Sequence, residues 1–379
     1  MQRSFRANAP LIVFLSAIVY ATSPAIAADN YNTQKHSIMV ETVADGLDQP
    51  WGMTELPDGS ILVTEKGGKL WRIENGNKTE VTGLPDISAA GQGGLLDIAA
   101  DENFQNNRKV YFTFSEPGPG GSGTALSSAR LSDDNNTLED LTLLFSMNRK
   151  SQGGRHFGSR IVLAPDDKIF ITTGDRGEPD RAQDYSDHAG AVIRLNRDGS
   201  VPDDNPHAAA GDNKTQPELW SKGHRNPQGA DLNPQSGELW IIEHGARGGD
   251  EVNIPVAGKN YGWPEISYGR HYSGQKIGQG FEAPGFEQPI WYWDPSIAPS
   301  GAAFYNGDLF PEWQGDLLVA ALKFQMLVRL EVDGDQISGE ERLLEDRYGR
   351  VRDVEVFSDG AVYLLTDSSD GRLLRITPG

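Results

Sequence analysis

Hydrophobic and polar positions alternate along most of the chain in short runs that are separated by turn residues. A turn rich in Asp, Gly, Asn or Pro precedes a run of alternating apolar residues, and a small-residue turn and a second run often follow. Because a period of two is that of a half-buried strand, each unit indicates paired β-strands. The clearest units are "LPDGSILVTEKGGKLWRI" from Leu56, "DENFQNNRKVYFTFSE" from Asp101, "APDDKIFITTGDRG" from Ala164, "NPQSGELWIIEHG" from Asn233, "PEWQGDLLVAALKFQMLVRLEV" from Pro311 and "FSDGAVYLLTDSSDGRLLRI" from Phe357.

This repeat predicts an all-β fold, a six-bladed β-propeller of four-stranded antiparallel sheets. Six units leave roughly 55 to 60 residues for each, which suits one blade and its loop. Residues 36–47 are predicted to form a strand that closes the ring against the last unit, because closure protects sheet edges. The long polar and aromatic loops are expected to gather on one face and to carry function. Two β-sandwich domains are the alternative, but no Pro/Ser-rich linker separates two halves.

The first 27 residues have the pattern of a secretory signal, with two arginines, no acidic residue, an apolar run and an "AIA" ending. We predict cleavage after Ala27 and export to the periplasm of a single domain, residues 28–379. A membrane anchor is the alternative, and the apolar run is short for one.

Composition narrows the chemistry. The hydrophobic fraction of 37% and the 44 glycines fit short strands and many turns, and the absence of cysteine excludes a thiol nucleophile and disulfides. The formal net charge of −20 argues against nucleic acid or an anionic membrane as a partner. No motif of a serine hydrolase, a zinc protease or a nicotinamide dehydrogenase occurs in the required setting.

Several cations lie at turns beside predicted strands, and they could converge on one anionic ligand. Arginine is suited to forked contacts with carboxylates, so a ligand with several carboxylates would satisfy them. The alternative is that each cation pairs with a neighbouring acid such as Asp353 or Asp231. The cations are Arg225, Lys323, Arg350 and Arg352.

Two further groups of residues are candidates for chemistry. Glu243, Asp250 and Glu251 lie among glycine turns, and such a mixture of carboxylates and backbone carbonyls is what Ca²⁺ prefers, although a solvated acidic turn is the alternative. His156 and Asp175 flank a predicted hairpin of residues 161–164 and 168–173. A hairpin returns its ends to one edge, so Asp175 could orient His156 as a general base. The alternative is an ordinary polar residue at the start of a strand.

Taken together, the sequence resembles the soluble quinoprotein sugar dehydrogenases, the family of glucose and aldose sugar dehydrogenases that depend on pyrroloquinoline quinone (PQQ). The resemblance covers nearly the whole chain after residue 27. It is carried, in the family's order, by "GQGGLLDIAADENF", "GGRHFGSRIVLAPDDKIFITTGDRG", "GHRNPQG", "GDEVNIPVAGKNYGWP", "ALKFQ" and "GRVRDVEVFSDGAVYLLTD".

The resemblance implies oxidation of an aldose at C1 to an aldonolactone, with hydride transfer to PQQ and electrons passed to an unidentified external acceptor. It implies His156 as the base, Asp175 as its partner and Arg225 as a group that polarises the quinone carbonyl. Cofactor contacts are then implied for Gln92, Arg225, Asn226, Lys323, Arg350 and Arg352. The carbonyls of Gly245 and Ala246 would bind a Ca²⁺ on the cofactor, and Glu251 with the carbonyl of Tyr261 would bind a structural Ca²⁺.

The loops that follow "YGWP" depart from the family pattern, and these loops would shape the sugar site. Tyr272 and Trp293 are the aromatic residues that we expect near the cofactor. The protein is expected to be a monomer or a weak homodimer. A non-catalytic propeller that binds sugar or protein, and a calcium-dependent lactonase, are the alternative functions, because a propeller alone does not specify an activity.

Overall fold

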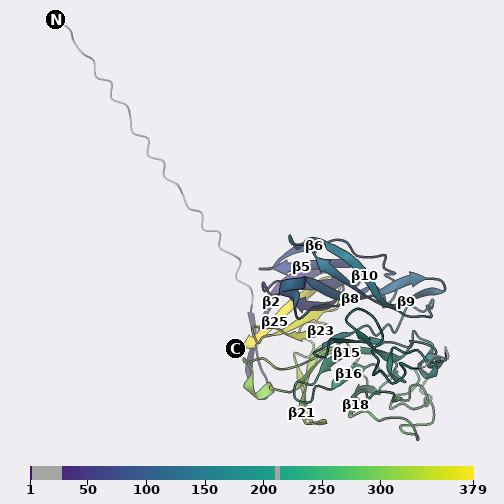
Figure 1. Ribbon diagram of the computed structural model, residues 1–379. Helices are drawn as coiled ribbons and strands as arrows, with labels where there is room; N and C mark the ends of the chain where they lie inside the picture. The colour runs from purple at the N-terminus through teal and green to yellow at the C-terminus, as the bar shows by residue number, and fades with distance from the viewer. Residues whose placement is uncertain (2–27, 210–213) are drawn as a thin grey trace.

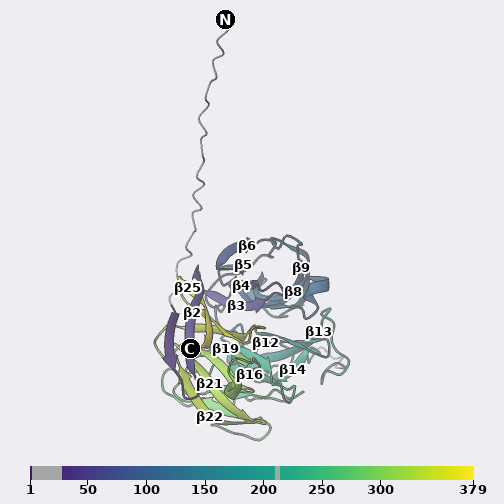
Figure 2. The same cartoon turned by 90° about the vertical axis from the view of Figure 1, so that its left-hand side faces the viewer.

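The computed structural model describes residues 1, 28–209 and 214–379, and it is a six-bladed β-propeller. The predicted fold is therefore confirmed, whereas residues 2–27 of the predicted export signal lie outside the described residues. Figures 1 and 2 show the chain passing from one small sheet to the next in sequence order. No helix in the described residues is long and apolar enough to cross a membrane.

Each blade is an antiparallel sheet, and blades one to five have four strands each. Blade one contains β3 (Pro50–Glu55), β4 (Ile61–Glu65), β5 (Lys69–Glu74) and β6 (Asn77–Val81). Blade two contains β7 (Leu95–Ala100), β8 (Lys109–Gly118), β9 (Gly121–Leu131) and β10 (Leu138–Ser146). Blade three contains β11 (Ile161–Ala164), β12 (Lys168–Thr173), β13 (Ala191–Asn196) and β14 (Leu219–Lys222). Blade four contains β15 (Pro227–Leu232), β16 (Leu239–Glu243), β17 (Asp250–Asn253) and β18 (Trp291–Trp293). Blade five contains β19 (Pro299–Phe304), β20 (Leu317–Ala321), β21 (Met326–Asp333) and β22 (Gln336–Leu343).

Blade six joins the two ends of the described chain, as the sequence predicted. It contains β23 (Val351–Val356), β24 (Val362–Thr366), β25 (Gly371–Pro378) and the early strand β2 (Ser37–Leu47), which pairs antiparallel with β25. Purple β2 lies beside yellow β25 in both views (Figures 1 and 2). One strand was not predicted: β1 (Ala28–Asn32) pairs with β2 and makes this sheet five-stranded. The short helices α1 (Phe104–Asn107), η1 (Pro179–Gln183) and η2 (Pro311–Trp313) lie in connections.

The hydrophobic core is divided among the contacts between neighbouring blades. Six clusters of buried side chains each join two adjacent blades, and the last joins blade six to blade one. A blade in a propeller is covered on both faces, which is why a strand such as β4 (Ile61–Glu65) is buried at every position. The first strand of each blade contacts the first strand of the next all round the ring. The connections that enter these strands therefore converge around the axis.

Candidate active site

His156 and Asp175 meet at the open end of the β11–β12 hairpin. The strand pair has the predicted bounds, and His156 Nδ1 lies 2.6 Å from Asp175 Oδ1. Two further donors hold the carboxylate: the amide of Gly177 donates to Oδ1 at 2.7 Å, and Nε1 of Trp263 donates to Oδ2 at 2.8 Å. The backbone amide of His156 in turn donates to Oε1 of Gln92 at 2.7 Å. The ring and its partner are thus fixed from three segments of the chain.

The surroundings of this pair favour a neutral imidazole and an ionised carboxylate. Burial lowers the pKa of His156, with a contribution from the charge of Arg225, while the hydrogen bond to Asp175 partly offsets the effect. Burial alone would raise the pKa of Asp175, but the hydrogen bond from His156 leaves it below its usual value. Because an ionised carboxylate can only accept, Nδ1 carries the ring proton and Nε2 keeps a free lone pair. That is the tautomer a general base needs.

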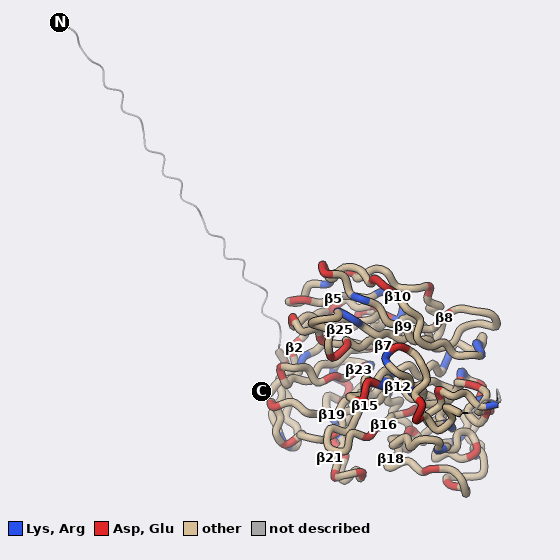
Figure 3. Tube along the Cα trace, viewed as in Figure 1, with Lys and Arg blue, Asp and Glu red and all other residues tan. Residues whose placement is uncertain are grey.

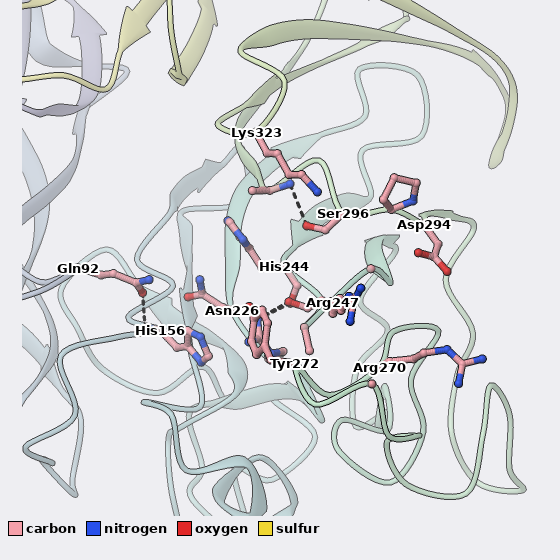
Figure 4. Close-up of a pocket in the computed structure, with 17 residues that line it drawn as sticks. Gln92, His156, Asn226, His244, Arg247, Arg270, Tyr272, Asp294, Ser296 and Lys323 are labelled. Carbon is pink, nitrogen blue, oxygen red and sulfur yellow. Dashed lines mark hydrogen bonds between the residues drawn. The ribbon is translucent and has the colours of Figure 1, made fainter.

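A cavity of about 890 Å³ opens beside His156, and it collects most of the predicted site residues (Figure 4). Its walls come from the connections between blades one and two, two and three, three and four, and four and five, and from loops of blades four and five. The predicted residues that line it are Gln92, His156, Arg225, Asn226, Gly245, Ala246, Tyr272 and Lys323.

Arg225 is anchored at the floor of this cavity. Its amide donates to Oε2 of Glu243 at 2.6 Å, and Nη1 donates to the carbonyl of Gly245 at 2.5 Å. Its guanidinium carbon lies 5.2 Å from the centre of the Trp263 ring, whereas its Nε has no hydrogen-bond partner among the described residues. Burying such a donor without a partner is costly, so the guanidinium keeps hydrogen-bonding capacity that the described residues do not use.

Arg350 and Arg352 line an adjoining cavity of about 480 Å³, which shares Gln92 and His244 with the first. Both arginines donate to Oδ2 of Asp367 at 3.0 Å. An acid therefore does pair with them, but it is neither of the two named from the sequence, because Asp353 pairs with Arg160 and Asp231 accepts backbone amides. Two cations share one carboxylate here. The pair keeps a net positive charge toward the cavity.

The predicted metal ligands lie in two places. Gly245 and Ala246 line the large cavity, and Glu251 and Tyr261 line a small void of about 10 Å³ together with Glu243. Gly245 and Arg225 line this void too. Burial and the charge of Glu243 raise the pKa of Glu251 to about 8. Within the described residues, no group of three or more His, Cys, Asp or Glu side chains has the arrangement of a metal site. A cation here would depend on backbone carbonyls as well as carboxylates.

The two aromatic residues predicted for the site have different positions. Tyr272 lines the large cavity with 74% of its surface exposed. Trp293 is 4% exposed, belongs to the cluster between blades four and five, and donates to Oε2 of Glu340 at 2.8 Å. Trp293 lines neither the large cavity nor the adjoining one, because its strand position in β18 directs it into the core.

Sequence reasoning missed three residues of the site. His244 lines both cavities, and burial together with the charge of Arg225 lowers its pKa well below the usual value, so it is neutral. Asp367 follows β24, and Trp263 fixes Asp175 from blade four. His244 stands directly before Gly245, and Asp367 lies opposite Arg350 and Arg352 at the open end of the β23–β24 hairpin, so both could have been found from the sequence, whereas Trp263 depends on a contact between blades.

Comparison with known proteins agrees with this architecture. A family model described as glucose/sorbosone dehydrogenase matches residues 47–375. The chain is 43% identical over 348 residues to Aldose sugar dehydrogenase YliI of Escherichia coli (strain K12), and the aligned region covers 90% of this chain and 93% of that protein. The crystal structure of the soluble aldose sugar dehydrogenase from Escherichia coli in the apo-form matches with a TM-score of 0.87 and 43% identity, over 90% of this chain and 100% of that one. The PQQ-bound form of aldose sugar dehydrogenase from Streptomyces coelicolor matches with a TM-score of 0.74 and 27% identity, over 93% and 99% of the two chains.

Proposed function

The chain belongs to the glucose/sorbosone dehydrogenase family, and from that premise we propose that it oxidises aldose sugars at C1 to aldonolactones with PQQ as its redox cofactor. The observation that carries the proposal is that His156, whose Nδ1 lies 2.6 Å from Oδ1 of Asp175, is on the wall of a cavity that Arg225 and Lys323 also line. A base beside convergent cations is what oxidation of a hydroxyl by an anionic cofactor requires.

The residues of the two joined cavities fit a planar ligand with three carboxylates. Arg352 supplies a guanidinium whose Nε has no hydrogen-bond partner among the described residues, as does Arg225. The ammonium group of Lys323 lies on the wall of the large cavity, where no ion pair to a described residue occupies it. Arg352, Arg350 and Lys323 would hold the carboxylates of PQQ, and Arg225 and Asn226 its quinone oxygens. Forked donors suit this ligand.

The protein's own residues supply the proton chemistry. Nε2 of His156 would remove the proton of the C1 hydroxyl, and Asp175 would hold the ring in position and stabilise the imidazolium that forms. Bound quinone supplies the acceptor for the two electrons and the hydrogen that leave C1. Arg225 would stabilise negative charge on the cofactor oxygen through its guanidinium. An aldose thereby loses two electrons and two protons and becomes a lactone, and an external acceptor takes the electrons.

Calcium is part of the proposal on the chemistry of the donors. The carbonyls of Gly245 and Ala246 would contribute to a cation on the cofactor, and that of Gly245 would exchange its bond from Arg225 for the ion. A second cation would lie between Glu251 and the carbonyl of Tyr261. Burial and the charge of Glu243, which raise the pKa of Glu251 to about 8, support a cation there, since both carboxylates line the same small void.

Reconstitution tests the proposal. Apo-protein is mixed with PQQ and Ca²⁺, and reduction of a redox dye is followed with a panel of aldoses. Dye reduction that requires the sugar, PQQ and Ca²⁺ together is expected. No reduction with any aldose, or hydrolysis of a lactone without quinone, would contradict it.

A further inference from the structure

Arg247 and Arg270 form a pair of cations on the wall of the large cavity. An isolated antiparallel bridge joins them: the amide of Arg247 donates to the carbonyl of Arg270 at 3.0 Å, and the reverse bond measures 3.4 Å. Residues directly opposite across such a bridge project their side chains to the same side. The backbone bridge therefore places the two arginines opposite each other on this wall, whereas Figure 4 shows their guanidinium groups lying apart.

Glycines make this close approach possible. A Cβ atom on Gly249 would lie 2.2 Å from the amide nitrogen of Gly269, and one on Gly269 would lie 2.2 Å from the carbonyl oxygen of Gly248. Gly249 also has a φ of +70°, which L side chains rarely adopt. The two loops that carry the arginines pack too closely for side chains between them, so their separation is a defined feature.

The pair carries uncompensated charge. Like charges directly opposite each other destabilise a ladder, and an acidic chain offers many carboxylates to offset them. Nevertheless, neither Arg247 nor Arg270 has a side-chain hydrogen bond or an ion pair in the described residues. Among the charged side chains that line this cavity, Arg225, Lys323 and the pair are opposed by Asp294 alone. The wall therefore favours an anion.

The position of the pair separates it from the cofactor residues proposed above. In Figure 4, Tyr272 lies between His156 on one side and Arg247 and Arg270 on the other. Tyr272 is 74% exposed, and its ring is a flat surface of the kind against which sugar rings stack. The carboxylates of PQQ are assigned to Lys323, Arg350 and Arg352, which leaves the pair without a role in holding it.

We infer that Arg247 and Arg270 bind an anionic group of the substrate, so that the preferred substrates are aldoses carrying a carboxylate or a phosphate remote from C1. C1 would lie at His156, the sugar would lie along Tyr272, and the anion would reach the arginine pair. Uronic acids, aldose 6-phosphates and short acidic oligosaccharides share this chemistry. The inference rests on the proposed function, because it concerns the substrate of that same site.

The test measures kcat/KM for D-glucose, D-glucuronate, D-glucose 6-phosphate and an acidic disaccharide with holoenzyme. The R247Q/R270Q variant removes both charges, R247K/R270K keeps them, and R372Q alters an exposed arginine elsewhere in the ring. The wild type is expected to favour at least one anionic aldose over glucose, and R247Q/R270Q to lower that ratio about tenfold or more. R247K/R270K should retain part of the preference, and R372Q all of it. Added salt should weaken the preference of the wild type for anionic aldoses over glucose.

The opposite results are equally clear. A wild type that prefers glucose to every anionic aldose, or a ratio unchanged in R247Q/R270Q, would overturn the inference. An unchanged ratio combined with a weaker PQQ affinity, measured by titrating apo-protein, would assign the pair to the cofactor instead. Absence of turnover with every aldose by the wild type would remove the proposed function itself. Oxidation of glucose with no role for the pair would remove the substrate preference alone.

Discussion

Replacing Asp175 with asparagine separates the charge and hydrogen bonding of this side chain from its volume. Oδ1 accepts from His156 Nδ1 and from the amide of Gly177, and Oδ2 accepts from Nε1 of Trp263. An amide has one accepting oxygen and one donating nitrogen. If the oxygen faces His156, the nitrogen meets the N–H of Trp263; if the nitrogen faces His156, it meets the N–H of Gly177 and places the ring proton on Nε2. Either orientation leaves one donor opposed by another.

Both orientations also remove the negative charge that stabilises the imidazolium. A hydrogen bond to a charged group contributes about 1.5–3 kcal/mol, which corresponds to roughly 10- to 150-fold in rate. Loss of the correct tautomer adds to this and approaches the full contribution of a general base, about 10²–10⁴. We expect kcat of D175N to fall within that range while the affinity for PQQ changes little, because the Asp175 carboxylate accepts no hydrogen bond from a cation assigned to the cofactor.

The assay combines dye-linked steady-state kinetics with a titration of apo-protein by PQQ. Asp184→Asn is the matched control, since Asp184 lies in the same connection between β12 and β13 but bonds Ser186 and Arg149 instead. D184N should keep its activity. A folded D175N enzyme with kcat near that of the wild type would refute the reasoning.

Four further results are expected. His156→Gln should bind PQQ normally and lose about 10²–10⁴ in kcat, and near-normal turnover would contradict its role as the base. In the wild type, kcat/KM should be level at pH 7 and above and fall as the pH drops below 6.5, because the lowered pKa of His156 keeps the ring neutral down to that range. D175N should move this fall in kcat/KM to lower pH, since the hydrogen bond to Asp175 raises the pKa of His156. A fall in kcat/KM that begins above pH 7 in the wild type would be inconsistent with this role. Arg352→Met should weaken PQQ binding about tenfold or more in equilibrium titration, whereas Arg372→Met should not, and equal affinities would argue against the carboxylate site. Removing Ca²⁺ with EGTA should lower the melting temperature of the wild type, and Glu251→Gln should abolish that difference. E251Q should also stabilise the calcium-free protein, because it removes a carboxylate whose pKa burial and the charge of Glu243 raise to about 8. A melting-temperature difference that persists in E251Q would exclude this ligand.

Local regularities in the sequence predicted much of the fold. The alternation of residues 161–164 and 168–173 gave the bounds of β11 and β12, and the same hairpin rule brought Asp175 to His156. Ring closure by β2 followed from the need to cover sheet edges, and β2 pairs with β25 accordingly. These features depend on neighbouring residues or on one general constraint, so a single sequence can reveal them.

Contacts between blades were harder to predict. Trp263 joins Asp175 only after the ring has set the angle and register of neighbouring blades. Asp367, in contrast, meets Arg350 and Arg352 at the open end of the β23–β24 hairpin within blade six, so the hairpin rule that paired Asp175 with His156 could have revealed it. The burial of Trp293 was not predicted, because the three-residue strand β18 carries no alternation that tells the core side from the cavity side. Figure 3 shows acidic and basic residues scattered along the trace across the molecule, so charge along the chain does not mark the site either.

Pre-steady-state oxidation of an aldose tests the central claim most directly. Wild-type protein loaded with PQQ and Ca²⁺ is mixed without oxygen with one equivalent of D-glucose or [1-²H]glucose, and the absorbance of the bound cofactor is followed. The account predicts stoichiometric reduction that is several-fold slower with the deuterated sugar and is nearly abolished in H156Q. Bound cofactor whose absorbance does not respond to any aldose, or reduction at an equal rate in H156Q, would contradict it.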